Sequence, residues 1–361
     1  MSHTRLLSVI VPACDAAATL PAALAAIINS GLPRDQYELI VVDDVSTDGS
    51  AEIAARYADT VVRLTGRRAG PAYGRNRGAE LAKGEILGFV DADVRVKPDA
   101  LSGMLMLLAG DPSLAAVTAS HHSATLNNLA TQYWSLLLRF GEMTQRSSGG
   151  DLGSPCALIR REAFFSAGMY DEWRFATAPL EGVELGNRLG SMGRQSVLLL
   201  DSATVALGRK NVRSLVRGMW NRSSLLARSL GYQRTREATP SDAVFTLSRS
   251  MAPIFAALCG VGFTASFVAE PNLVLEAAAV LMGAIVLNSP IYAFFARARG
   301  VAFAIAVIPL HLLMQAVSAT GLCAGRILRD AVGDCVPDAA TQAYAEVGVN
   351  TWPPVPRSPA R

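Results

Sequence analysis

The sequence is poor in charged residues and has no cysteine pattern that would build a metal site or a disulfide framework. Its 361 residues include five cysteines, which are far apart and odd in number: Cys14, Cys156, Cys259, Cys323 and Cys335. This spacing fits neither a zinc site nor a disulfide-rich secreted scaffold, so we expect a reducing compartment. Charged residues make up only 17% of the chain and hydrophobic residues 51%, which is more apolar than is usual for a soluble enzyme.

Two further patterns are missing. The N-terminal segment MSHTRLLSVIVPACDAA has only a short apolar run, broken by Pro12 and Asp15, and lacks the long core of a signal peptide. We therefore expect the front of the chain to stay in the cytoplasm. No G-x-G-x-x-G motif follows a strand pattern, which argues against a dinucleotide site. Gly70, Gly74 and Gly78 are instead expected to permit tight turns.

The few charges are unevenly distributed, because most of them precede residue 250. Three apolar blocks follow at 251–269, 277–296 and 301–325, each close to the roughly 20 residues that a helix needs to cross a bilayer. Buried core helices of a soluble domain are the alternative. Arg297 and Arg299 separate the last two blocks, and the positive-inside rule places this loop on the cytoplasmic side. The prediction is a multi-pass protein of the inner (plasma) membrane with a cytoplasmic catalytic domain. The polar residues of the third block make it the weakest span.

These features divide the chain into four predicted parts. An α/β domain covers 1–208, a basic amphipathic interfacial segment covers 209–248, and two to three transmembrane helices cover 249–325. The tail, 326–361, ends in TWPPVPRSPAR and is expected to be disordered because it is rich in proline.

Strand and helix patterns alternate through the first hundred residues. Strands are predicted at 6–11, 37–42, 60–64 and 86–90, with helices at 20–28, at 51–57 and around 79–82. Such alternation is typical of a mostly parallel sheet covered by helices on both faces. Ligands of these sheets bind at the carboxyl ends of the strands.

Acidic residues occur where the predicted strands end. Asp15 follows the first strand, Asp43 and Asp44 follow the second, and Asp91 and Asp93 follow the fourth. Two carboxylates at i and i+2 suit a hard divalent cation such as Mg²⁺ or Mn²⁺, which neutralises a diphosphate and stabilises it as a leaving group. A solvated strand-to-loop corner is the ordinary alternative for an Asp-x-Asp pair.

Three segments resemble, in order, the family 2 glycosyltransferases of GT-A fold: SVIVPACDAAATL, ELIVVDDVSTDGS and GPAYGRNRGAELAKGEILGFVDADV. The second has Val45 where the family usually has glycine. The resemblance implies a nucleotide-sugar donor. The resemblance assigns the binding of nucleobase and ribose to Ala13, Asp15, Asp43 and Asp44. It assigns Arg75 and Asn76 to the diphosphate or its pocket. Asp91 and Asp93 would bind the metal, and Asp91 would also bind the donor. Carboxylates can accept from base N–H and ribose O–H groups, and arginine can fork onto a diphosphate.

Residues 149–200 resemble the acceptor side of the same family, with one departure. The family's Glu-Asp pair is Glu181-Gly182 here, so the aspartate expected to act as general base is missing. Three readings stay open: Glu181 serves as the base, the acceptor is already anionic and needs little base, or transferase activity has been lost. Glu184 is expected to pair with Arg188 at i+4.

A run of eight cations without an acid precedes the apolar blocks: Arg209, Lys210, Arg213, Arg217, Arg222, Arg228, Arg234 and Arg236. Interleaved Leu and Trp residues predict a helix at the membrane interface, with Trp220 at headgroup level. Arg217 and Arg222 are candidates to hold phosphate of the acceptor or of the donor diphosphate, and a solvated basic face is the alternative. The apolar blocks directly downstream argue against nucleic acid as a partner.

Taken together, the sequence predicts an inverting glycosyltransferase that moves a sugar from a UDP- or GDP-linked donor to a lipid-linked or membrane-proximal acceptor, with polyprenyl phosphate as the first choice. A catalytically degenerate relative, acting as a binding or assembly factor in cell-envelope glycan synthesis, is the alternative that Gly182 favours. A nucleotidyltransferase is less consistent with the sequence, because Pro12-Ala13-Cys14-Asp15 is not a glycine-rich basic loop.

Overall fold

The computed structural model describes residues 6–122, 128–144, 152, 155–172, 180–206, 210–233, 281–332 and 348–352. Contacts within the chain define two compact units, each of which is described by itself. The first consists of Met1–Thr125, Gly141–Gly208 and Val336–Arg361, and the second of Leu126–Phe140 and Arg209–Cys335.

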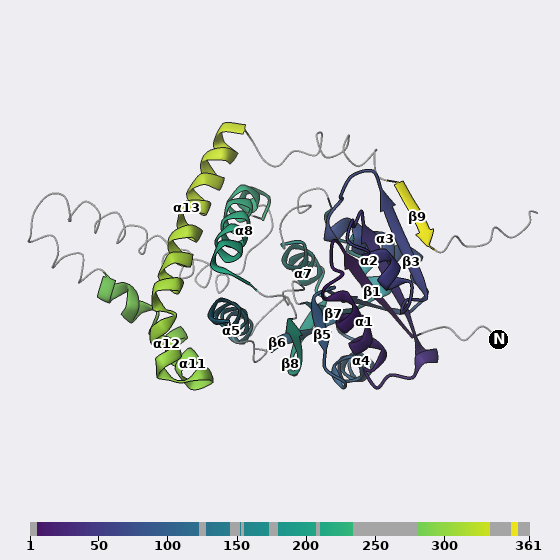
Figure 1. Cartoon of the computed structure of the whole chain (residues 1–361). Helices are drawn as coiled ribbons and strands as arrows, with labels where there is room; N and C mark the ends of the chain where they lie inside the picture. Colours follow the sequence, from purple (N-terminus) through teal and green to yellow (C-terminus); the bar gives the residue numbers. More distant parts are fainter. Residues whose placement is uncertain are drawn as a thin grey trace, which may run out of the picture. The chain divides into compact units, whose positions relative to one another are not determined.

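The first unit is built on a sheet that has nine strands within the described residues, in the order β5-β8-β6-β7-β4-β1-β2-β3-β9 (Figure 1). The parallel half consists of β1 (Leu7–Ala13), β2 (Tyr37–Asp44), β3 (Thr60–Thr65) and β4 (Ile86–Val90). The other strands are β5 (Val94–Val96), β6 (Leu114–His122), β7 (Cys156–Arg160), β8 (Gln195–Ala206) and β9 (Gly348–Trp352). Strand β7 runs antiparallel to both β4 and β6. The predicted α/β class with a mostly parallel first half is confirmed.

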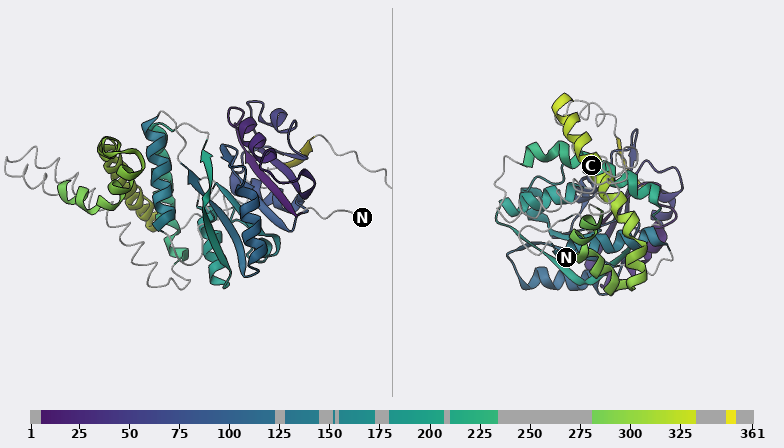
Figure 2. Two further views of the ribbon diagram at one scale, coloured as in Figure 1. Left: turned by 90° about the horizontal axis from the view of Figure 1, so that it is seen from below. Right: turned by 90° about the vertical axis from the view of Figure 1, so that its left-hand side faces the viewer.

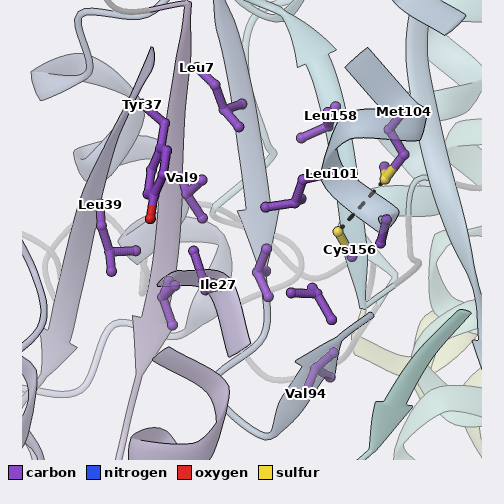
Figure 3. Packing of buried hydrophobic residues seen from close by; sticks show 14 of the residues in the cluster. Leu7, Val9, Ile27, Tyr37, Leu39, Val94, Leu101, Met104, Cys156 and Leu158 are labelled. Carbon is purple, nitrogen blue, oxygen red and sulfur yellow. Dashed lines mark hydrogen bonds between the residues drawn. The ribbon is translucent and has the colours of Figure 1, made fainter. Parts of the chain in front are cut away.

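Helices cover both faces of this sheet because its central strands are apolar on both sides. Successive side chains of a strand point to opposite faces, so Val9 and Val11 join one core cluster while Ile10 joins the other. The first cluster includes α1 (Leu20–Ile28) and α4 (Ala100–Gly110), and Figure 3 shows Ile27 near Val9 and Leu101 between Leu7 and Leu158. The second includes α3 (Pro71–Leu81), α6 (Arg161–Ser166) and α7 (Glu181–Ser191).

Two of the glycines that the sequence assigns to turns serve helix–sheet packing instead. Gly74 and Gly78 lie within α3, and a Cβ atom at Gly78 would lie 2.4 Å from Ile10 Cγ2 on β1. The absence of a side chain therefore lets the helix approach the sheet closely. Gly70 does occupy a turn, with φ 90°, directly before α3.

Part of the tail at 326–361, for which the sequence predicts disorder, forms regular structure. Strand β9 pairs antiparallel with β3, with Asn350 opposite Arg63 and Trp352 opposite Val61. The open edge of β3 offers unpaired backbone N–H and C=O groups, and β9 satisfies them. Helix α13 (Ile308–Val332) also continues past residue 326.

The second unit is helical. Its described helices are α5 (Leu129–Thr144, shared with the first unit from residue 141), α8 (Val212–Gln233), α11 (Ser289–Arg299), α12 (Val301–Ala306) and α13 (Figure 2, green to yellow for the last three). A further helical segment, Leu281–Leu287, precedes α11. Tyr133, Leu215, Phe295 and Met314 contribute to its apolar core. Helices α8 and α13 pack closely, since a Cβ at Gly325 would lie 2.1 Å from the carbonyl oxygen of Ser224.

Among the described residues, one helix is long and apolar enough to cross a membrane, at Ile308–Ala331. The second apolar block is not a single straight helix, because Leu281–Leu287 and Ser289–Arg299 meet at an angle of 64°. Pro290 lies at the start of α11, where a proline without an N–H begins a new helix more readily than it continues an old one. The block at 251–269 lies outside the described residues. The described helices therefore do not support the multi-pass prediction.

Candidate functional site

The loops after β1 and β2 are joined by carboxylate hydrogen bonds. Asp15, in a left-handed conformation with φ 46°, accepts from the backbone N–H of Thr47 at 2.8 Å and pairs with Arg68. The Thr47 amide and then the Arg68 side chain lower the pKa of Asp15. Ala13 ends β1 opposite Asp43 of β2. The two loops are thus held together at the carboxyl edge of the sheet.

Asp43 is buried without full hydrogen bonding. Its side chain is 1% exposed, and its nearest cation is Arg63, with Nε 3.7 Å from Oδ2. Among the described residues, Oδ1 has no hydrogen-bond partner. Burial raises the pKa of Asp43, although a hydrogen bond from Ser46 opposes this shift. A ligand that donates a hydrogen bond would satisfy Oδ1.

The neighbouring Asp44 is used within the fold. Its Oδ1 accepts from the backbone N–H of Ala69, and its Oδ2 accepts from that of Gly70, both at 2.8 Å. Two backbone donors therefore anchor the segment that leads into α3. This arrangement gives Asp44 a structural role at the position that the resemblance assigns to nucleobase and ribose binding.

Arg75 connects the donor and acceptor sides of the predicted site. From α3, its Nη2 donates to Asp91 Oδ1 at 2.7 Å and its Nη1 to Glu181 Oε1 at 2.6 Å. Its guanidinium carbon also lies 5.5 Å from the ring centre of Tyr170. Burial alone would lower the pKa of Arg75, but the two carboxylates outweigh burial and raise that pKa above its ordinary value. Arg75 therefore stays charged and holds both carboxylates in place.

Asn76 supports the acceptor side from within the core. Its Nδ2 donates to Tyr170 O and to Glu172 Oε2, each at 2.9 Å, and its Oδ1 accepts from the Tyr170 N–H at 3.1 Å. These bonds attach the segment around residues 170–172 to α3. Asn76 therefore orients this segment.

Asp91 and Asp93 follow β4 as the sequence predicts. The Asp91 side chain is 37% exposed and bonds Arg75 through Oδ1 only, and its backbone N–H donates to Pro155 O at 3.0 Å. Asp93 is half-buried. The described residues contain no group of three metal-binding side chains. Two partly exposed carboxylates still fit Mg²⁺ or Mn²⁺, because such ions use one or two carboxylates together with the phosphates of a substrate.

Glu181 and Glu184 begin helix α7 and are both buried, but their surroundings differ. Glu184 accepts from Arg188 through both oxygens, at 2.7 and 2.5 Å, which confirms the predicted i+4 pair. Glu181 is held by Arg75 through Oε1, while Oε2 is buried with no partner among the described residues. Gly182, between them, provides no side chain that could act as a base.

Arg217 and Arg222 belong to the second unit. Both lie on α8, where Arg217 and the nearby Trp220 are exposed and Arg222 is half-buried. Tyr170 and Arg68 are the contacts that sequence reasoning missed. Each is a single residue in a loop, and no local pattern marks a long-range contact of this kind.

Known proteins resemble part of the chain in sequence and most of it in fold. The family model described as "Glycosyl transferase family 2" matches residues 8–165. A poly(ribitol-phosphate) beta-glucosyltransferase of Bacillus spizizenii is 33% identical over 100 residues, which cover 26% of this chain and 16% of that protein. The uncharacterized glycosyltransferase YibD of Escherichia coli is 37% identical over 123 residues, which cover 33% of this chain and 35% of that protein. The match thus spans well under half the length of these relatives.

A solved structure shares the fold over most of the chain. It is the mannosyltransferase PcManGT from Pyrobaculum calidifontis in complex with GDP-Man and Mn²⁺, with a TM-score of 0.59 and 22% identity, covering 89% of this chain and 86% of that one. The residues matched by the family model contain the parallel half of the sheet together with Asp43, Arg75 and Asp91. Residues 8–165 of the chain form a glycosyl transferase family 2 domain.

Proposed function

We propose that the protein is an inverting glycosyltransferase that takes a sugar from a UDP- or GDP-linked donor and transfers it to a lipid-linked or membrane-proximal acceptor. The observation that carries this proposal is that β2 and β4 present carboxylates at the same edge of the sheet. Asp43 and Asp91 end strands that flank β1 in the sheet, and Arg75 links Asp91 to the acceptor-side helix α7.

The nucleoside of the donor is assigned to the edge formed by β1 and β2. Asp43 Oδ1, buried and without a described partner, is suited to accept a hydrogen bond from a base N–H group. Ala13 and Asp15 form the adjoining part of this edge, and Asp44 supports it through the backbone of Ala69 and Gly70.

The diphosphate is assigned to the end of β4. Asp91 and Asp93 would hold Mg²⁺ or Mn²⁺ there, and the bound ion would stabilise the departing nucleoside diphosphate. The Mn²⁺ and GDP-Man in the structurally similar mannosyltransferase support this assignment. Arg75 keeps Asp91 oriented through the 2.7 Å hydrogen bond.

The second unit is assigned to the plasma membrane, with 209–248 at its interface. Exposed Arg217 and Trp220 on α8, together with half-buried Arg222, suit anionic lipid headgroups or a phosphate of the acceptor. Helix α13 supplies an apolar stretch of sufficient length for anchoring. A degenerate, non-catalytic protein of cell-envelope glycan assembly is the second candidate, and Gly182 favours it.

The test uses the full chain in detergent with UDP-glucose, UDP-GlcNAc and GDP-mannose, each with and without Mn²⁺. We expect one donor to raise the melting temperature only with Mn²⁺ and to release its nucleoside diphosphate. Asp93→Ala should weaken both effects at least tenfold, whereas Asp99→Ala, an exposed aspartate nearby, should leave them unchanged. No response to any donor, or an Asp93→Ala variant that behaves as the wild type, would refute the proposal. Donor binding without turnover would select the degenerate alternative, and release of pyrophosphate would indicate nucleotidyl transfer.

A further inference from the structure

One buried carboxylate oxygen on the acceptor side is left without a partner by the described fold. The Glu181 side chain is 5% exposed, its Oε1 accepts from Arg75 Nη1 at 2.6 Å, and its Oε2 makes no hydrogen bond to any described residue. A buried acceptor in this state costs stability unless a ligand or water donates to it. Glu184, three residues along the same helix, shows the satisfied arrangement, since Arg188 donates to both of its oxygens.

The position of Glu181 relates it to the donor site. Asp91 and Glu181 bind two nitrogens of the same guanidinium, so Arg75 fixes an acceptor-side carboxylate next to the residue assigned to the metal. The ion pair compensates the charge of the buried Glu181 while leaving Oε2 available. Arg75 is a positioning residue in this arrangement, because it acts through the two carboxylates that it holds.

The charge of this pair limits the acceptor. A neutral hydroxyl group can donate a hydrogen bond to Oε2 and then give up its proton. A phosphate monoester carries about −1.5 to −2 charge at pH 7, so its oxygens would face the Glu181 carboxylate and would leave Oε2 with little to accept. This contrast favours an alcohol acceptor over the polyprenyl phosphate that the sequence suggested first.

We infer, resting on the proposed glycosyl transfer, that Glu181 is the general base for a neutral hydroxyl acceptor, in place of the carboxylate missing at Gly182. The acceptor O–H proton moves to Glu181 Oε2 while the acceptor oxygen forms a bond to the anomeric carbon. The bond between that carbon and the diphosphate oxygen breaks, and its electron pair leaves with the nucleoside diphosphate. Charge and atoms balance without any further reactant.

The test compares two acceptors on the full chain in detergent. Dodecyl glucoside offers neutral hydroxyls beside an alkyl tail, and undecaprenyl phosphate offers an anionic oxygen. We expect transfer to dodecyl glucoside only, and where neither is used, hydrolysis of the donor by water reports on the same base. Glu181→Gln should lower kcat about 100-fold or more, as loss of a general base does, while donor KM stays within threefold. Glu181→Asp should recover part of kcat.

Two readouts separate catalysis from folding. The Mn²⁺-dependent thermal shift caused by the donor should persist in Glu181→Gln, because that variant keeps an oxygen for Arg75. Glu184→Gln serves as the buried control on the same helix, and its kcat should stay within tenfold of the wild type. Transfer to undecaprenyl phosphate that survives Glu181→Gln, or an equal loss of kcat in Glu184→Gln, would overturn the inference. Failure of the wild type to bind or turn over any donor would instead refute the proposed function itself.

Discussion

Replacing Arg75 by methionine should destabilise the first unit strongly, because Arg75 neutralises a buried carboxylate. The Glu181 side chain is 5% exposed and would be left as a buried charge without a cation at its oxygen. Removing one partner of a buried ion pair costs about 3–5 kcal/mol. Asp91 is 37% exposed and can regain water, so it adds less. For a unit of this size, about 1 kcal/mol shifts the melting temperature by about 2–4 °C, so we expect a fall of about 6–20 °C.

The double variant Arg75→Met/Glu181→Met tests the origin of this loss. Apolar groups of similar volume often replace a buried ion pair at little cost, so the double variant should recover most of the stability. The difference between the double variant and the sum of the single variants measures the coupling between the two residues. A coupling of about 2 kcal/mol or more would agree with the observed 2.6 Å hydrogen bond.

The measurement is thermal unfolding of the full chain in detergent at pH 7, followed by circular dichroism at low and high salt. Because the pair is buried, high salt should change the difference between wild type and Arg75→Met only slightly. An Arg75→Met variant that melts within 2 °C of the wild type would refute the reasoning. So would a double variant as unstable as Arg75→Met alone, since Glu181 would then not be the source of the cost.

Three further substitutions are tested by the melting temperature of the variant. Gly84→Ala should lower the free energy of unfolding by about 1–3 kcal/mol, because the added Cβ would lie 2.7 Å from the backbone nitrogen of Ser8. Gly110→Ala is the control and should be neutral or stabilising, because its Cβ would have no atom within 4 Å. Equal effects of the two substitutions would contradict the packing argument. Val45→Gly should stabilise by about 1 kcal/mol, because a β-branched residue at φ 54° is strained; a loss of stability would show that the side chain contributes more than the strain costs. Burial raises the pKa of Asp43, so its contribution to stability falls as pH rises through that pKa. Asp43→Asn should therefore melt at a higher temperature than the wild type at pH 7–8 and lose this advantage in acid. The variant should also bind the donor more weakly. An advantage in melting temperature that grows in acid would contradict the upward direction of the Asp43 pKa shift.

The parallel half of the sheet could be predicted from the sequence because its signals are local. The helix predicted at 20–28 coincides with α1, and the strand predicted at 86–90 coincides with β4. Strands buried on both faces read as continuous apolar runs, and the prolines, glycines and aspartates at their ends mark the boundaries.

The rest of the sheet depends on contacts between residues distant in sequence. Strand β7 runs antiparallel between β4 and β6, and β9 pairs with β3 across more than half the chain. No periodicity within a short window encodes such neighbours. The apolar block at 277–296 shows a different limit, because its composition indicated a span but does not register the bend before α11, which begins beside Asn288 and Pro290.

The sequence predicted where the candidate site lies, but not which of its side chains bond to one another. Strand ends placed Asp43 and Asp91 correctly at the carboxyl edge, since this follows from parallel topology alone. The hydrogen bond from Arg75 to Glu181 joins residues 106 positions apart, and nothing near either residue announces it. Acidic motifs therefore locate an edge, whereas the structure shows which acids meet there.

Hydrogen-bond satisfaction then separates structural acids from candidate functional ones. Asp44 and Glu184 each have both oxygens engaged, by backbone amides and by Arg188. Asp43 and Glu181 are equally buried, yet each keeps one oxygen without a partner among the described residues. Folding alone gains nothing from an unsatisfied buried acceptor. In each pair the sequence shows only two acids close together, so the incomplete hydrogen bonding, rather than the motif, makes Asp43 the candidate for donor binding and Glu181 the candidate base for the acceptor.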